Sequence, residues 1–109
     1  MEQARIAVIG LGGRGRYFAQ AFDRHPRAEL VAVADPSDKP LALLKHQYGD
    51  RIRYYQDYHD MLQAPDIDAV VVASNDKSHR ENAVAVFEAG KSCLLEKPMA
   101  QSVADCDDI

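Results

Sequence analysis

The chain has 109 residues, of which 47% are hydrophobic and 28% charged, a composition typical of one soluble globular domain. Its net charge of −4 argues against a nucleic-acid partner, which normally requires a basic surface, and no apolar run is long enough to cross a membrane. Two cysteines, Cys93 and Cys106, form neither a disulfide framework nor a metal-binding spacing, so we expect a cytoplasmic protein without a metal.

Short apolar runs alternate with helical patterns in the first half of the chain. A proline at position 26 ends the first helical pattern, because the residue before a proline avoids the helical conformation. In the second pattern Pro40 suits the first turn and Gly49 the stop. In chain order, we predict a strand over 6–9, a helix over 14–24, a strand over 30–34, a helix over 40–48 and a strand over 53–55.

The second half continues the alternation. The run 69–73 is apolar at every position, as expected for a parallel strand that is buried on both faces. Ser78 and Glu81 have the spacing of a capping box at the start of the next helix, and Gly90 is its stop signal. We predict a helix over 58–63, a strand over 69–73, a helix over 78–89, a strand over 92–95 and a further helix opening at Ser102.

This order of elements predicts an α/β fold, a doubly wound parallel sheet of the Rossmann type with helices on both faces. The full dinucleotide-binding fold has six strands, whereas this sequence accounts for five. We therefore expect residues 1–109 to be one NAD(P)-binding domain, truncated before its sixth strand and before a second, substrate-binding domain. The strand 92–95 would then have an open edge, which favours pairing with a second copy in a homodimer.

A glycine motif, G-x-G-x-x-G, lies between the first strand and the first helix. Gly10 would make the tight turn, Gly12 would let the backbone approach a pyrophosphate, and Gly15 would let helix and strand pack closely. Gly13 and Arg14 complete the turn, at a helix N-terminus that attracts phosphate. The alternative is a glycine-rich turn with no ligand.

Asp35 ends the second strand, twenty residues after the last glycine of the motif. An acid at this spacing binds the adenosine ribose hydroxyls, and its charge repels a 2′-phosphate, so it favours NAD over NADP. Arg14, Arg16 and Ser37 keep NADP open, because an arginine could turn toward a 2′-phosphate. The alternative is that Asp35 only begins a turn.

Further polar side chains follow the fourth and fifth strands. In an open α/β sheet ligands bind outside the carboxyl ends of the strands, so these residues are candidates for the nicotinamide side of the site. The alternatives are a helix cap after the fourth strand and a solvated charged loop after the fifth. The candidates are Ser74, Asp76 and His79 after the fourth strand and Glu96 and Lys97 after the fifth.

These segments together resemble the Gfo/Idh/MocA family of glucose–fructose oxidoreductase and inositol dehydrogenase. The resemblance rests on residues 8–15, 67–74 and 79–81, and on residues 89–91 followed by 95–100, of which this last stretch is the most specific. It implies a two-domain enzyme that moves a hydride between NAD(P) and the carbinol carbon of a sugar, an inositol or a related polyol. It also implies that Lys97 is catalytic and acts beside the nicotinamide.

The sequence departs from this family in two respects. Asp76 stands where members often carry an amide, and the family's catalytic histidine with its acidic partner would lie after residue 109. We therefore expect the isolated chain to be inactive. Two other functions stay open within the resemblance: a glycosidase that uses tightly held NAD, and a regulator that binds NAD(P) without chemistry.

Overall fold

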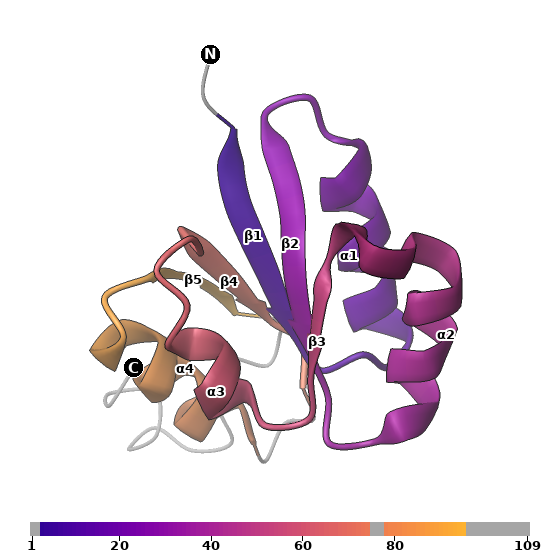
Figure 1. Ribbon diagram of the computed structural model, residues 1–109. Coiled ribbons are helices and arrows are strands. Elements are labelled where there is room, and N and C mark those ends of the chain that lie inside the picture. Colours follow the sequence, from indigo (N-terminus) through magenta and orange to yellow (C-terminus); the bar gives the residue numbers. More distant parts are fainter. Residues whose placement is uncertain (1–2, 75–77, 96–109) are drawn as a thin grey trace.

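The computed structural model describes residues 3–74 and 78–95, which form one parallel sheet with helices on both faces (Figure 1). The five strands lie in the order β3-β2-β1-β4-β5. The elements are β1 (Ala4–Ile9), α1 (Gly13–Arg24), β2 (Ala28–Ala34), α2 (Asp38–Tyr48), the 3-10 turn η1 (Gly49–Arg51), β3 (Arg53–Tyr55), α3 (Tyr58–Leu62), β4 (Ala69–Val72), α4 (His79–Glu88) and β5 (Ser92–Leu95). The predicted doubly wound fold with five strands is confirmed.

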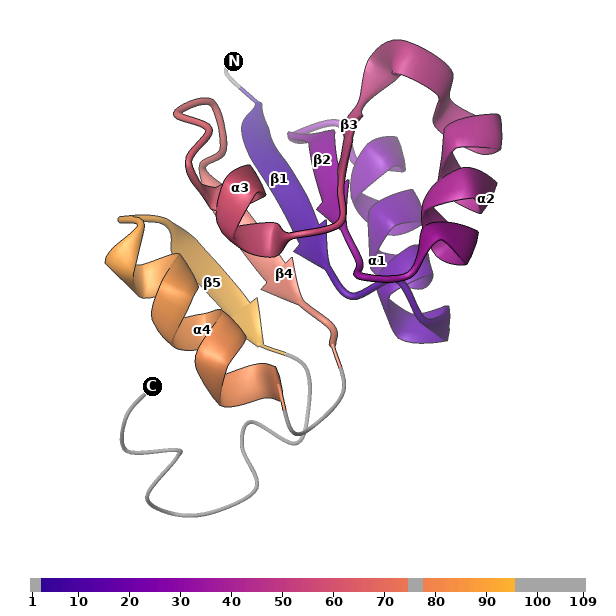
Figure 2. The same ribbon diagram turned by 60° about the horizontal axis from the view of Figure 1, so that its bottom comes forward.

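The direction of winding reverses beside β1. The chain first passes outward through β2 to β3, then returns to place β4 and β5 on the other side of β1. As a result α1 and α2 cover one face of the sheet, and α3 and α4 cover the other (Figure 2). Loops therefore diverge at the carboxyl ends of β1 and β4, where open α/β sheets bind their ligands.

Alternate residues of the central strands fill two hydrophobic cores. Ile6 and Val8 face the α1–α2 core, whereas Ala7 and Ile9 face the α3–α4 core. The pairing of β1 with β2 skips Val31, because Ile6 pairs with Leu30 and Ala7 with Ala32. Because of this bulge, the side chains of β2 after Val31 still alternate between the two cores.

Most predicted boundaries are within two residues of the observed ones. Gly49 and Gly90 end their helices with positive φ angles of 60° and 76°, as a helix stop requires. The predicted capping box is wrong: Ser78 has a helical backbone conformation and its side chain makes no capping hydrogen bond. A capping residue normally needs an extended backbone, from which its oxygen reaches the first turn. The helix expected from Ser102 lies outside the described residues.

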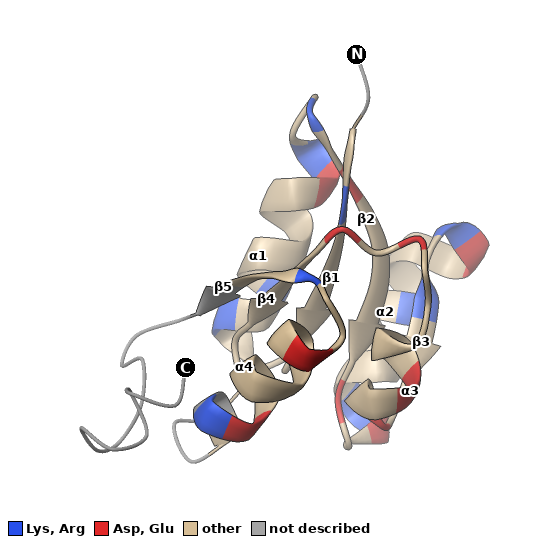
Figure 3. Cartoon of the chain, turned by 90° about the vertical axis from the view of Figure 1, so that its left-hand side faces the viewer, with Lys and Arg blue, Asp and Glu red and all other residues tan. Residues whose placement is uncertain are grey.

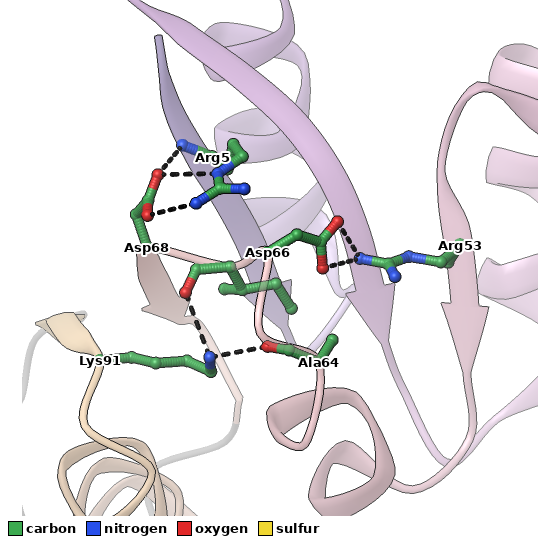
Figure 4. Close-up of polar contacts among 7 residues, drawn as sticks. Arg5, Arg53, Ala64, Asp66, Asp68 and Lys91 are labelled. Carbon is green, nitrogen blue, oxygen red and sulfur yellow. Dashed lines mark hydrogen bonds and ion pairs between the residues drawn. The ribbon is translucent and has the colours of Figure 1, made fainter. Parts of the chain in front are cut away.

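Charged residues of both signs are interspersed along the described chain (Figure 3). Three of the cations hold the loop before β4, at the amino ends of the strands (Figure 4). Arg5 binds Asp68 through both carboxylate oxygens, and the Arg53 guanidinium donates to Asp66 at 2.6 and 2.8 Å. The Lys91 ammonium donates to the carbonyl oxygens of Ala64 and Ile67 at 2.8 and 3.1 Å. This end of the sheet is thus tied by charge, while the opposite end is open.

No helix in the described part of the chain has the length and apolar character that a membrane span requires.

Candidate dinucleotide-binding cleft

A cleft of about 790 Å³ lies at the carboxyl ends of β1, β2 and β4. One side is the glycine loop that joins β1 to α1, and the other side is formed by the start of α3 and the start of α4. Its lining includes Gly10, Leu11, Gly12, Gly13, Arg14, Asp35, Pro36, Gln56, Asp57, Tyr58, His59, Ser74, Ser78 and Asn82. The cleft therefore lies where the reversal of winding places a ligand.

Two glycines of the loop are required by packing. Gly10 has a φ of 90°, and a Cβ there would lie 2.6 Å from the backbone of Ser74. A Cβ on Gly15 would lie 1.7 Å from the carbonyl oxygen of Gly10. Gly15 is buried behind the loop, where its lack of a side chain lets α1 pack against the turn.

The two glycines between them have a different environment. A Cβ on Gly12 or Gly13 would meet no atom within 4 Å, so internal packing does not account for the missing side chains. Gly12 caps α1 without a side-chain hydrogen bond, and no acidic residue lies in the first turn of that helix. The positive end of the helix dipole therefore faces the cleft without a carboxylate from its own first turn. The open space at Gly12 and Gly13, here named the phosphate seat, fits the pyrophosphate of a dinucleotide.

Asp35 is half-buried beside the same loop and anchors it. One carboxylate oxygen accepts from the Leu11 N–H at 2.8 Å, and the other accepts from the Ser37 N–H at 2.8 Å. Asp35 therefore begins its own turn, as the alternative interpretation expected, and it also holds the glycine loop, while its binding of a ribose stays a prediction. An ionised carboxylate has about four acceptor positions, so both oxygens retain capacity for ribose hydroxyls.

Arg14 lies at the rim of the cleft. Its guanidinium carbon is 5.4 Å from the ring centre of Phe18 and 5.9 Å from that of Tyr17, on the same helix. These contacts hold the cation near the phosphate seat, while the side chain remains exposed.

The far side of the cleft includes residues that the sequence reasoning missed. Asp57 caps α3 and accepts from both the backbone N–H and the ring of His59, and these bonds lower the pKa of the Asp57 carboxyl. Tyr58 stacks on the His59 ring, and burial raises the pKa of its phenol. Asn82 is buried in α4 and accepts a hydrogen bond from the Ser74 hydroxyl.

A signal for part of this side was present in the sequence. Residues 56–59 follow the third strand directly, so the rule that ligands bind at carboxyl strand ends applies to them as well. Asn82 gave no such signal, because its position four residues into a helical pattern suggests only a surface amide.

The structure brings six of the predicted site residues together around the cleft and places a seventh, Gly15, directly behind it. The six are Gly10, Gly12, Gly13, Arg14, Asp35 and Ser74. The backbone of His79 begins α4. Asp76, Glu96 and Lys97 lie outside the described residues. Within residues 3–74 and 78–95 no group of three or more His, Cys, Asp and Glu is arranged to hold a metal ion.

An uncapped helix N-terminus behind a glycine turn, next to an acid at the end of the neighbouring strand, defines the class of dinucleotide-binding Rossmann domains. Residues 4–109 match the model of the Gfo/Idh/MocA oxidoreductase family, described as an NAD-binding Rossmann fold. The chain belongs to this family, and the part of the family fold that it contains is the NAD-binding domain.

Relatives and solved structures agree with this assignment. The chain is 35% identical to myo-inositol 2-dehydrogenase of Thermotoga maritima, over 94% of this chain and 30% of the relative. It is 32% identical to glycosyl hydrolase family 109 protein 2 of a Shewanella species, over 100% of this chain and 26% of the relative. The scyllo-inositol dehydrogenase of Lactobacillus casei, solved with NAD(H) and scyllo-inositol, superimposes with a TM-score of 0.89 at 26% identity, covering 97% of this chain and 31% of that one. The chain thus spans about 30% of the length of the relatives that it matches.

Proposed function

We propose that the chain binds NAD for an oxidoreductase that acts on an inositol or a related polyol in the cytoplasm. The observation that carries the proposal is the open seat at Gly12 and Gly13, bordered by the Asp35 carboxylate. Gly10 and Gly15 shape the turn, and Arg14 attracts the phosphates from the rim. Asp35 receives the adenosine ribose.

We propose NAD rather than NADP as the preferred cofactor. The Asp35 carboxylate faces the cleft, so a 2′-phosphate on the ribose would bring two negative charges together. The Arg14 guanidinium is packed against aromatic rings of its own helix. Arg16 and Ser37 do not line the cleft.

The nicotinamide side of the site is proposed from the family resemblance. Asp76 and His79 after β4 would line it, and Glu96 and Lys97 after β5 would complete it, while Ser74, directly at the end of β4, would contact the adenosine half of the cofactor. Bound NAD supplies a reversible hydride acceptor at C4 of its nicotinamide. Lys97 would donate a hydrogen bond to the substrate oxygen and so stabilise negative charge there.

The substrate and the other half of the crevice belong to the remainder of the protein in this proposal. Two of the matched relatives are named as inositol dehydrogenases, which favours a cyclic polyol as substrate. The similarity to a glycosyl hydrolase supports a second candidate, an NAD-dependent glycosidase, for which the same cofactor cleft would serve.

We also propose a homodimer, with the edge strand β5 facing the partner, and sedimentation over a range of concentrations tests it.

Titration with NADH, followed by its fluorescence, tests the cofactor site. We expect saturable binding by the chain and at least about tenfold weaker binding by Gly12→Val, because the new side chain would fill the phosphate seat. The Gly12→Val chain should still fold, since no atom lies within 4 Å of the added Cβ. Ala42→Val, on the exposed side of α2, is the matched control. Equal NADH affinity in Gly12→Val and Ala42→Val would refute the site.

A further inference from the structure

A buried amide connects two hydroxyl groups on the α3–α4 side of the cleft. Asn82 is 3% exposed and is the buried polar residue of the described core. Its side-chain oxygen accepts a hydrogen bond from Ser74, which directly follows β4, and its side chain also contacts the hydroxyl of Tyr58 in α3. All three residues line the cleft.

Tyr58, Ser74 and Asn82 form one wall of the cleft. Their arrangement fixes which of these side chains donates and which accepts in each hydrogen bond. Ser74 has one hydroxyl proton, and it is committed to the oxygen of Asn82, so toward any further partner Ser74 acts as an acceptor. Asn82 also forms a side-chain hydrogen bond with Tyr58, and because its oxygen is bonded to Ser74, its amide N–H groups are its donors toward the phenol oxygen. Tyr58 therefore keeps its own proton for another acceptor.

The wall lies where the base of a dinucleotide would extend from Asp35. The Asp35 N–H donates to the carbonyl of Tyr55 at 3.0 Å, so the ribose-binding acid is joined directly to the end of β3. Three residues later Tyr58 opens α3 and lines the same cleft as Asp35. A base attached to a ribose at Asp35 can thus reach the wall without leaving the cleft.

We infer that Ser74 and Tyr58, oriented by Asn82 as a positioning residue, recognise the edge of the adenine base. Adenine presents an exocyclic amine, which donates, beside ring nitrogens, which accept. An acceptor at Ser74 and a donor at Tyr58 match this pair. The inference rests on the proposed function, because it requires the ribose of a dinucleotide at Asp35.

Nicotinamide hypoxanthine dinucleotide provides the test, because a carbonyl replaces the exocyclic amine and the neighbouring ring nitrogen carries a proton. Both directions of hydrogen bonding at the base edge are thereby reversed. We expect the chain to bind NAD about 2- to 10-fold more tightly than this analogue, the range given by one hydrogen bond. In Asn82→Leu and in Ser74→Ala the ratio of the two affinities should fall toward one.

Tyr54→Phe is the matched control for Tyr58→Phe. The Tyr54 hydroxyl donates to the carbonyls of Leu44 and Gly49, away from the cleft, so its removal should leave the ratio unchanged while Tyr58→Phe lowers it. If Asn82→Leu does not fold, Ser74→Ala and Tyr58→Phe decide the outcome.

Two results would overturn the inference and are distinguishable from failure of the proposed function. Equal affinity of the unaltered chain for NAD and the analogue would show that the base edge is not read. If the ratio of the affinities for NAD and the analogue is unchanged in both Ser74→Ala and Tyr58→Phe, this wall does not recognise the base. Absence of binding to either dinucleotide at millimolar concentration would instead refute the cofactor site itself, and the inference with it.

Discussion

Asp35 has two roles, and a substitution that changes one of them also disturbs the other. It orders the glycine loop through Leu11 and its own turn through Ser37, and in the proposed function it also binds the ribose. Replacing the acid to admit a 2′-phosphate therefore removes an anchor of the phosphate seat at the same time. A change of cofactor preference at this position has a structural cost that the sequence motif does not reveal.

We expect Asp35→Ser to narrow the preference for NAD over NADP while weakening the binding of both. The Leu11 N–H loses its acceptor, and the free energy of unfolding should fall by about 1–2 kcal/mol. Parallel titrations with the two cofactors and urea unfolding measure both effects, with the exposed Asp50→Ser as control. Undiminished stability, with NADP bound as tightly as the unaltered chain binds NAD, would contradict the anchoring role of Asp35.

At the scale of single elements, the loop before β4 is held by side chains from several other parts of the chain. Arg5 from β1, Arg53 from β3 and Lys91 from the turn before β5 all bind it, so three parts of the chain converge on one loop (Figure 4). Exposed ion pairs contribute little individually, but these fix where β4 begins and hence its register with β1. The register in turn sets where Ser74 meets the glycine loop.

The two carboxylates in this loop should make stability fall at low pH. Hydrogen bonds from Arg53 lower the pKa of Asp66, and those from Arg5 lower the pKa of Asp68. A carboxyl whose folded pKa is depressed contributes stability above its unfolded value of about 3.9, and that contribution is lost as the pH falls through the folded value. Urea unfolding between pH 6 and roughly pH 2 measures it.

The double variant Asp66→Asn and Asp68→Asn is the control for this pH dependence. We expect it to be less stable than the unaltered chain near neutral pH, by a small amount because both side chains are partly exposed, and to lose less stability on acidification. If the free energies of unfolding of the two proteins fall equally with pH, other carboxylates are responsible for the loss of stability in acid.

The elements were predictable where one local rule decided the outcome. Continuous apolar runs predicted the strands of the sheet. Gly49 and Gly90 predicted helix ends because the backbone there takes a positive φ angle, which glycine adopts readily. The capping box failed because the backbone of Ser78 is itself helical, so the spacing of Ser78 and Glu81 alone did not decide the cap. Asn82 was missed because burial depends on packing between elements, which no local pattern encodes.

For the whole molecule, we propose that the cleft is one side of a larger binding crevice. In the proposed function the described residues supply the phosphate seat, the ribose acid and the wall around Asn82, in a chain that spans about 30% of the length of its relatives. Positioning of a substrate against a cofactor accounts for a large part of the rate of such reactions. In the proposed function this positioning comes from the rest of the protein.

The purified 109-residue chain should therefore bind NAD without turning over myo-inositol, scyllo-inositol or glucose. Absorbance of NADH, followed over hours at high protein concentration, is the measurement. A full-length relative such as the Thermotoga maritima enzyme serves as the positive control. Sustained NADH formation by the chain alone would mean that the catalytic groups lie within these residues.

The contact between Gly10 and Ser74 also limits how the domain can move. With no room for even a methyl group between them, the ends of β1 and β4 form a continuous seam rather than a hinge. Any opening and closing around a ligand would therefore occur outside this seam. The nucleotide seat would behave as a fixed platform, and amide hydrogen exchange at the Ala73 N–H, which donates to Ile9, should be slow both with and without NAD.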